Sequence, residues 1–398
     1  MSGGGLSRAG LDRLHAVLAA AVERGDAPGL VAVVHRRGET HVVTLGTMAA
    51  GGDDPMRRDA IFRISSMTKP VTAVAAMILV EEGRLYLDEP LDDLLPELAD
   101  LRVVRSIDAA LDDTVPAERP ITLRDLLTSR LGSGLMFSPP DDCPLQRAMG
   151  EAGLTPGPDN PDMSPDEWIK RLGALPLAHQ PGTVFTYHTP IEVLSVLIAR
   201  AAGRPFDEFL RERIFEPLGM VDTGYRVPTA DLGRMPVQYV PDWQTGATIR
   251  RAEPRDGSWD RPPAFPSGGT GLCSTADDYL AFCRMLLDRG RYAGGRILSR
   301  PAVELMTTDH LTPGQKAGSE ILLGSSGWGF GLAVDTRRDQ VFTNPGRFGW
   351  SGGMGTSAYV DPAEGLVGVL MTQQAFSSPQ PSRVVTDFWT AAYSAIDD

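Results

Sequence analysis

The sequence contains little lysine. Lys69, Lys170 and Lys316 are its only lysines among 38 lysines and arginines, so arginine supplies nearly all of the positive charge. Arginine stays protonated in proteins, whereas a partly desolvated lysine can lose its proton and act as a base. A lysine kept at a particular position in such a chain therefore suggests a chemical role.

Cysteine and histidine are also scarce, which limits the kinds of site that the chain can build. The three cysteines, Cys143, Cys273 and Cys283, contain no CxxC pair, and this favours reduced thiols over a disulfide framework or a zinc site. The six histidines show no HExxH-like spacing. We therefore expect neither a metal site nor a cofactor.

Basic clusters and long apolar runs are absent as well. The net charge of −13 and the pI near 5.0 argue against nucleic acid or an anionic membrane as a partner. The opening residues lack a basic run followed by an apolar segment, and no stretch approaches the length of a membrane span. We expect a cytoplasmic globular enzyme that acts on a small molecule; no motif indicates its oligomeric state.

The spacing of apolar residues predicts helices and strands at both ends of the chain. Helices are expected at residues 6–24, 275–289 and 382–395, and another helix should run from a serine cap at Ser65 or Ser66 to a stop at Gly83. Strands are expected at 29–34 and 41–45, joined by a turn at Arg37 and Gly38, and at 329–335, 356–361 and 366–372.

These elements predict an α+β architecture. An antiparallel sheet with terminal helices should form one α/β domain from residues 1–83 and 262–398. Residues 84–261 should form an inserted, mainly helical domain with two proline-rich stretches, 138–166 and 254–266. Long loops of this kind often frame binding sites, so the active site is expected between the two domains.

Ser66 and Lys69 form the strongest candidate for chemistry. At positions i and i+3 of a helix both side chains lie on one face, so the Lys69 amine can reach the Ser66 hydroxyl. Unpaired backbone N–H groups in the first helical turn would favour an oxyanion beside the serine. The SxxK pattern alone also fits a helix cap followed by a solvated lysine.

Further segments favour a nucleophile and its base over a helix cap and a solvated lysine. With Ser66-Met67-Thr68-Lys69-Pro70, the chain resembles the serine β-lactamase and penicillin-binding-protein superfamily, most closely its class C-like esterases, the family VIII carboxylesterases. The resemblance covers nearly the whole chain and implies a β-lactamase-like fold. Other segments that carry it are residues 120–129, 180–187, 203–206, 216–223 and 266–271. Residues 120–129 resemble the segment that precedes "HTSGL" in the family, and this chain has Arg130-Leu131-Gly132-Ser133-Gly134-Leu135 in place of that motif.

The family's second motif, Tyr-x-Asn, aligns with Tyr187-His188-Thr189. The resemblance implies that Tyr187 is a general base or proton shuttle with Lys69, provided that a neighbouring ammonium lowers its pKa. A core tyrosine is the alternative. His188 is expected to face elsewhere, as a surface or structural residue, and Thr189 replaces the asparagine.

The family's third motif, Lys-Thr-Gly, is replaced here by Trp350-Ser351-Gly352-Gly353, as in class C-like esterases. The resemblance assigns substrate binding to Trp350, Ser351 and Gly352, with the tryptophan as an uncharged apolar wall that favours esters over anionic lactams. It also assigns the oxyanion hole to the backbone N–H groups of Ser66 and Gly353. Core packing is the alternative for Trp350.

One further pattern, GxSxG at Gly349 to Gly353, is that of the α/β-hydrolase nucleophile elbow. That elbow needs a strand before and a helix after its serine, whereas strands are expected after Ser351. We therefore take Ser66 as the nucleophile of a carboxylesterase that forms an acyl-serine intermediate, with short acyl chains preferred. A weak β-lactamase, an amide or D-peptide hydrolase, an acyltransferase and a non-catalytic penicillin-binding-type sensor remain alternatives.

Overall fold

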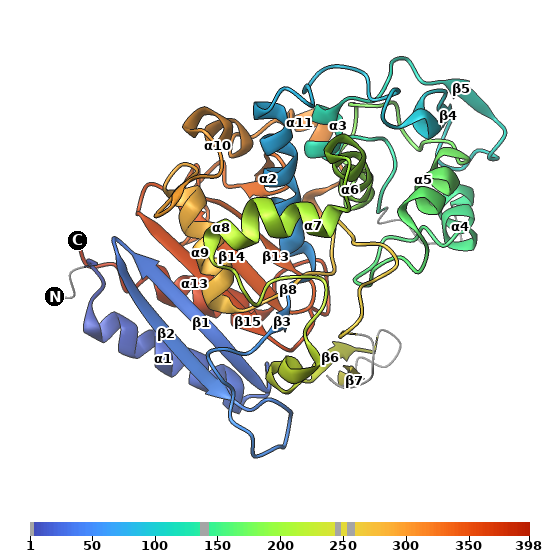
Figure 1. Ribbon diagram of the computed structural model, residues 1–398. Coiled ribbons are helices and arrows are strands. Elements are labelled where there is room, and N and C mark those ends of the chain that lie inside the picture. The colour runs from blue at the N-terminus through green and yellow to red at the C-terminus, as the bar shows by residue number, and fades with distance from the viewer. Residues whose placement is uncertain (1–3, 136–142, 243–247, 253–258) are drawn as a thin grey trace.

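A seven-stranded antiparallel sheet forms the centre of the computed structural model, which describes residues 4–135, 143–242, 248–252 and 259–398 (Figure 1). The sheet contains strands from both ends of the chain, which lie side by side because β1 pairs with β15. In spatial order the strands are β11 (Gly327–Trp328), β12 (Ala333–Val334), β13 (Phe348–Gly352), β14 (Thr356–Asp361), β15 (Leu366–Thr372), β1 (Gly29–Arg36) and β2 (Glu39–Gly46).

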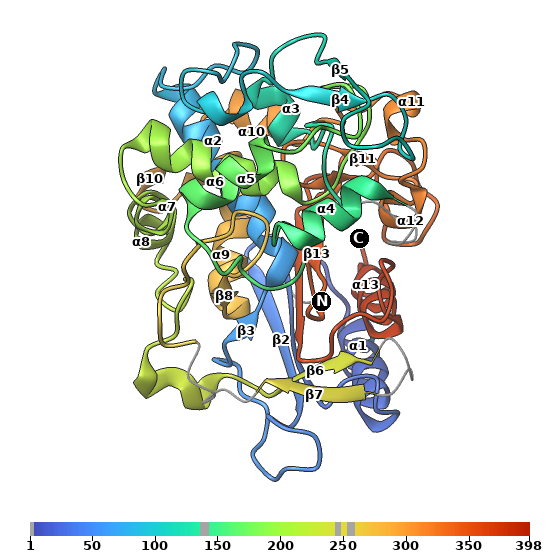
Figure 2. The ribbon, with the colours of Figure 1, turned by 90° about the vertical axis from the view of Figure 1, so that its right-hand side faces the viewer.

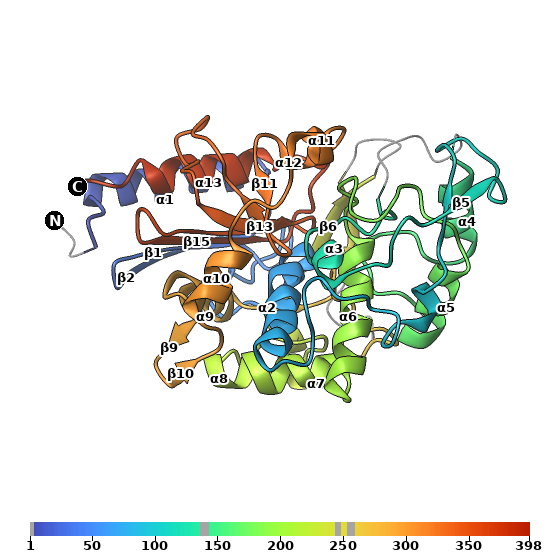
Figure 3. The same cartoon turned by 90° about the horizontal axis from the view of Figure 1, so that it is seen from above.

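The sheet is covered on both faces, as the uninterrupted apolar run of β1 requires. Val31 and Val33 pack on one face with α2 (Thr68–Glu81) and α9 (Ala276–Leu287). Leu30, Ala32 and Val34 pack on the other face with α1 (Arg8–Glu23) and α13 (Arg383–Tyr393). Alternate side chains of a strand point to opposite faces, so each face of β1 enters a separate core. Figure 3 shows the helices on the two sides of the sheet.

Most of the predicted elements are confirmed. The expected strands at 29–34, 41–45, 356–361 and 366–372 are β1, β2, β14 and β15, and the expected helices at 6–24, 275–289 and 382–395 are α1, α9 and α13. The hairpin turn also forms as expected, with positive φ at both Arg37 and Gly38.

The predicted strand at 329–335 is wrong as a single element. The chain turns at Gly331, where φ is +70° and the backbone N–H donates to the carbonyl of Leu127. A Cβ at Gly331 would lie 2.9 Å from the carbonyl oxygen of Lys69. Phe330 and Leu332 on either side are fully buried. Only Ala333 and Val334 of the run lie in a strand, β12. Phe330 and Leu332 are instead buried in the core cluster that also contains α2, so their apolarity does not indicate a strand.

The residues between α2 and α9 form mainly helices and irregular loops. In Figure 2 the helices α3 to α6 lie toward one end of the molecule and the β6–β7 hairpin toward the other. The helices are α3 (Leu123–Leu127), α4 (Pro144–Glu151), α5 (Pro165–Gly173), α6 (Thr189–Ala202), α7 (Phe206–Leu210) and α8 (Glu216–Leu218). Residues 138–142 and 254–258 of the proline-rich stretches lie outside the described residues, and the domain limits stay a prediction.

Short strand pairs and helices complete the fold. The pairs are β3 (Phe62–Arg63) with β8 (Cys273–Ser274), β4 (Arg102–Val104) with β5 (Thr114–Pro116), β6 (Gln238–Pro241) with β7 (Thr248–Ala252), and β9 (Arg291–Tyr292) with β10 (Gly295–Arg296). The remaining helices are α10 (Arg300–Met306), α11 (Pro313–Lys316) and α12 (Glu320–Leu323). Over the described ranges, no helix combines the length and apolarity that a bilayer crossing needs.

Candidate active site

Ser66 lies in a 3₁₀ turn, Ser65–Met67, directly before α2. The predicted serine cap is therefore wrong: the N-cap of α2 is Met67, whose side chain makes no capping bond, and the helix begins at Thr68. Ser65 has a φ of +47°, a left-handed conformation that costs energy in a residue other than glycine. The turn leaves the Ser66 hydroxyl free of a capping role and exposes it to a cavity.

Lys69 lies next to this hydroxyl and is completely buried. Its Nζ is 3.0 Å from Ser66 Oγ, 2.6 Å from the carbonyl oxygen of Gly269 and 3.3 Å from Nδ1 of His188. Burial lowers the pKa of Lys69 to about 7, against a smaller opposing effect of the Glu192 carboxylate. The amine is therefore partly unprotonated at neutral pH, as the scarcity of lysine suggested.

Tyr187 is also brought to the serine. The Lys69 Nζ lies 4.5 Å from the centre of the Tyr187 ring, and the Tyr187 hydroxyl interacts with the Ser66 side chain. Burial raises the pKa of Tyr187 above its ordinary value despite these hydrogen bonds. The expected lowering of this pKa by an ammonium is thus wrong, because desolvation outweighs the neighbouring donors. At neutral pH the residue is a phenol that can donate a proton.

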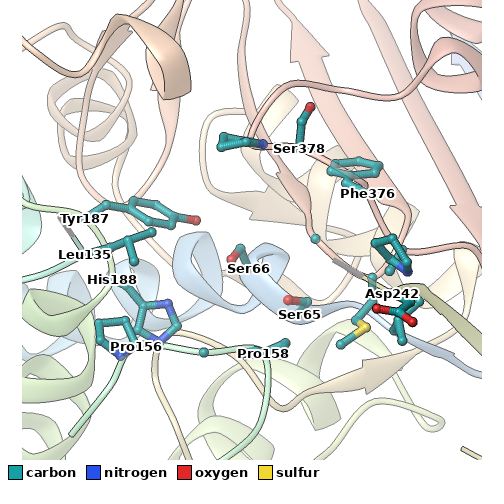
Figure 4. A pocket seen from close by; sticks show the side chains of 17 residues that line it. Ser65, Ser66, Leu135, Pro156, Pro158, Tyr187, His188, Asp242, Phe376 and Ser378 are labelled. Carbon is teal, nitrogen blue, oxygen red and sulfur yellow. The ribbon is translucent and has the colours of Figure 1, made fainter. Parts of the chain in front are cut away.

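His188 is another correction, because it is buried and contacts Lys69. Its φ of 78° and ψ of −68°, with a 3.1 Å bond from the Thr189 N–H to the Tyr187 carbonyl, define a rare γ-turn. Neighbours in an extended segment point to opposite sides. This turn instead directs the side chains of Tyr187 and His188 into one cavity (Figure 4). Thr189, aligned with the family asparagine, is buried at the start of α6.

Two residues that sequence reasoning overlooked extend the site behind His188. Glu192 Oε1 lies 3.0 Å from His188 Nε2 and accepts a 2.5 Å hydrogen bond from the Ser267 hydroxyl. A signal for Glu192 was present in the sequence, since it is the single charged residue of the apolar run 189–198. A carboxylate on the buried face of an apolar helix needs a polar partner.

The segment 266–271 passes close to both α2 and α6. The Gly269 carbonyl accepts from Lys69, and the Gly268 carbonyl accepts from the Thr72 hydroxyl at 2.8 Å. A Cβ at Gly268 would lie 2.4 Å from the carbonyl oxygen of Ile191. The glycine therefore allows the close approach that places a carbonyl acceptor at the lysine.

The residues 350–353 lie at the end of β13 and the turn that follows it. The Trp350 indole N–H donates to the Tyr187 hydroxyl at 2.7 Å, and the Ser351 hydroxyl bonds that of Ser357 at 2.9 Å. A Cβ at Gly352 would lie 2.1 Å from the carbonyl oxygen of Ile64.

These three residues, Trp350, Ser351 and Gly352, are not among those that line the cavity at Ser66 in the described part of the chain, whereas Gly353 is. Their assignment to substrate binding stays a prediction. The α/β-hydrolase elbow is excluded for Ser351, because strand β14 follows β13 where the elbow needs a helix.

A cavity of about 700 Å³ opens over Ser66. Figure 4 shows Tyr187 and His188 on one side of the serine and Phe376 and Asp242 on the other. Its wall is largely apolar, and among the described residues that line it there is no lysine or arginine. The apolar side chains among these residues are Leu135, Pro156, Pro158, Val240, Pro241, Met354, Ala375, Phe376 and Pro379.

Comparisons with known proteins show the family to which the chain belongs. A family model described as Beta-lactamase matches residues 14–385. Protein Rv1367c of Mycobacterium tuberculosis is 38% identical over 374 residues, which cover 91% of this chain and 90% of that protein. Esterase EstB of Burkholderia gladioli is 31% identical over 386 residues, which cover 92% and 90%.

Among solved structures, EstCE1 is described as a hydrolase with promiscuous acyltransferase activity. It matches with a TM-score of 0.78 and 26% identity, covering 97% of this chain and 99% of that chain. The β-lactamase-like fold is thereby confirmed. The chain belongs to the Beta-lactamase family, within the serine β-lactamase and penicillin-binding-protein superfamily, where it resembles the family VIII esterases.

Proposed function

We propose that this protein is a carboxylesterase that forms an acyl intermediate on Ser66. The observation that carries the proposal is the 3.0 Å approach of the Ser66 hydroxyl to a fully buried amine whose pKa is lowered to about 7. A serine hydroxyl becomes a useful nucleophile when an adjacent base takes its proton. A non-catalytic penicillin-binding-type sensor would not need to bear the desolvation of such an amine.

In the proposed reaction Ser66 Oγ attacks the ester carbonyl carbon while its proton passes to Lys69. The backbone N–H groups of Ser66 and Gly353 hold the oxyanion of the tetrahedral intermediate. Tyr187 gives its phenolic proton to the departing alkoxide and is reprotonated from the Lys69 ammonium. Water then attacks the acyl carbon while one of its protons passes to Lys69. The bond from the acyl carbon to Ser66 Oγ breaks, Ser66 takes the proton of Tyr187, and Tyr187 is reprotonated from Lys69 as the carboxylic acid leaves.

The cavity supports an uncharged ester as substrate. Its largely apolar wall holds no cationic side chain among the described residues, so a substrate carboxylate would lose its hydration without gaining a counterion. We therefore expect anionic β-lactams to be poorer substrates than neutral esters. Acyl transfer to a small alcohol is the second candidate, because EstCE1, which shares the fold at 26% identity, is described as having promiscuous acyltransferase activity. Amide or D-peptide hydrolysis is a weaker alternative.

Intact-mass analysis after treatment with a serine-directed phosphonate tests the proposal. One adduct is expected on the wild type, peptide mapping should place it on Ser66, and none should form on Ser66→Ala. Ser106→Ala is the matched control and should be labelled like the wild type, since Ser106 is exposed and does not line the cavity. An adduct that persists on Ser66→Ala would contradict the assignment of the nucleophile.

Substrate class is the next prediction. A neutral p-nitrophenyl ester should exceed its analogue with a carboxylate on the acyl chain by about tenfold or more in kcat/KM, because burying an uncompensated charge is costly. Nitrocefin turnover should be weak. The expected preference for short acyl chains requires kcat/KM to fall from butyrate to octanoate, and a rise along that series would overturn it.

Trp350→Phe separates a role as hydrogen-bond donor to Tyr187 from the substrate-binding role that the resemblance implies for Trp350. Loss of the indole N–H removes the 2.7 Å hydrogen bond to the Tyr187 hydroxyl, and kcat is expected to fall about three- to tenfold with KM nearly unchanged. Steady-state kinetics on one neutral ester decide the matter. A higher KM at unchanged kcat would instead favour the substrate wall predicted from the sequence.

A further inference from the structure

The pair formed by His188 and Glu192 has no role in the reaction described so far, although both residues are buried at its centre. His188 is held in the γ-turn conformation, with φ of 78°, which is costly for a residue other than glycine. Strained backbone of this kind persists where surrounding interactions maintain it, and it is common at active sites. The strain therefore prompts the question of what the His188 ring does at Lys69.

The Glu192 carboxylate determines which nitrogen of His188 carries the proton. Glu192 Oε1 lies 3.0 Å from His188 Nε2 and also accepts from the Ser267 hydroxyl at 2.5 Å. An ionised carboxylate only accepts hydrogen bonds, so His188 Nε2 must donate. Burial and the adjacent Lys69 lower the pKa of His188, which keeps the ring neutral near pH 7. Its Nδ1 is then an acceptor.

The acceptors around Lys69 in turn orient its lone pair. A neutral amine has two N–H bonds and one lone pair. The carbonyl oxygen of Gly269, at 2.6 Å, can only accept, and His188 Nδ1, at 3.3 Å, accepts in the tautomer that Glu192 selects. With both N–H bonds directed to these atoms, the lone pair points to the third neighbour, the Ser66 hydroxyl at 3.0 Å.

We propose that His188 and Glu192 are positioning residues that aim the Lys69 lone pair at the Ser66 proton. The inference rests on the proposed function and adds two residues to it. Once the proton of Ser66 has moved to Lys69, the ammonium has three N–H bonds, and Gly269, His188 and the oxygen at the serine supply three acceptors. The pair thus serves both protonation states without movement of the lysine.

Other titratable groups lie close to His188 and Glu192. Tyr187 lies on the cavity side, and Tyr225 donates to the Ser267 carbonyl at 2.5 Å. Asp159 and Asp162 line an adjoining pocket of about 280 Å³ together with His188 and Glu192. Variants that change a single group are therefore compared over a full pH range.

The first test measures acylation by rapid-mixing kinetics with a p-nitrophenyl ester. His188→Phe keeps a planar aromatic ring and removes both nitrogens, and it is expected to slow acylation about 10- to 100-fold with KM little changed. His15→Phe replaces an exposed histidine of α1 and should acylate like the wild type. Wild-type acylation and an unchanged pH profile in His188→Phe would overturn the proposal.

Glu192→Gln provides a second readout that a purely structural role would not alter. The amide oxygen can still accept from His188 Nε2, so acylation should stay within about tenfold of the wild type. The charge that supports the Lys69 ammonium is lost, however, and because Glu192 raises the pKa of Lys69, the acid limb of the rate profile should move to lower pH. Glu192→Leu offers no acceptor and should match His188→Phe.

These variants remain informative if one of them folds poorly. Should His188→Phe fail to fold, the contrast between Glu192→Gln, which keeps an acceptor for His188 Nε2, and Glu192→Leu, which has none, carries the test, and equal acylation rates in these two variants overturn the proposal. The result is also separable from the proposed function. Phosphonate labelling lost in Ser66→Ala with normal kinetics in the His188 and Glu192 variants would retain the esterase and reject the positioning role, whereas labelling that persists in Ser66→Ala would reject the esterase scheme itself.

Discussion

Lys69→Met is expected to lower the acylation rate about 10⁴-fold, since it removes the base that takes the Ser66 proton. Lys69→Arg should be nearly as inactive, because a guanidinium stays protonated and cannot accept a proton. Lys170→Met, which replaces an exposed lysine, is the matched control. Burst kinetics with a p-nitrophenyl ester measure the effect. A wild-type burst in the Lys69→Met variant would contradict the assignment of Lys69 as the base.

The pH dependence of the wild-type acylation rate also tests Lys69 as the base. Lys69 must be unprotonated to accept, and its pKa is about 7, so the acylation rate should rise with pH through that value and level off above it. Below it the rate should fall about tenfold for each pH unit. The Lys69→Met variant should lack this limb. A profile that remains flat from about pH 5 to 8 would contradict the assignment of Lys69 as the base.

The buried amine also affects the free energy of unfolding. Unfolded Lys69 keeps its proton up to its ordinary pKa of 10.5, whereas folded Lys69 releases it at about 7. Between these values the unfolded state binds more protons, so the wild type should gain stability with rising pH, relative to Lys69→Met, by at most about 1.4 kcal/mol per pH unit. Below about pH 7 the difference should be constant. Guanidinium denaturation across this range measures it.

Tyr187→Phe is expected to slow the hydrolysis of alkyl esters about 10³-fold, because a poor alkoxide leaving group needs the phenolic proton. The p-nitrophenolate ion departs without protonation, so a p-nitrophenyl ester should lose only about tenfold. Tyr86→Phe is the control, since Tyr86 is 54% exposed. The contrast between leaving groups is the decisive measurement: equal losses with both esters would make Tyr187 a structural residue.

The structure supports the direction of that proton transfer. Tyr187 accepts the Trp350 N–H on its oxygen, and burial raises its pKa, so its own hydrogen is retained at neutral pH and is available for donation toward Ser66. A resting tyrosinate, by contrast, would have to exist as an anion inside a largely apolar wall. In the reaction that we propose, Lys69 is therefore the first proton acceptor and Tyr187 the proton donor to the leaving group.

Much of the fold followed from local patterns. The unbroken apolar run of β1 is that of a strand buried on both faces, whose alternate side chains enter two separate cores. Apolar spacing alone identified α1, α9 and α13. The first part of the apolar run 329–335 was misread, because Phe330 and Leu332 are buried in the core cluster that also contains α2 and do not lie in a strand, whereas Ala333 and Val334 form β12. Periodicity reports burial, and it does not say which neighbour provides it.

At the site, the sequence by itself determined that Ser66 and Lys69 could meet, since three positions along a helical turn bring two side chains to one face. Only the tertiary structure decided the protonation states of the site residues and their hydrogen-bond partners. The pKa values of Lys69 and Tyr187 depend on burial by distant segments, and the γ-turn that directs His188 to Lys69 is a backbone conformation that no residue pattern encodes. Desolvation and long-range hydrogen bonds arise only when the chain has closed around the site.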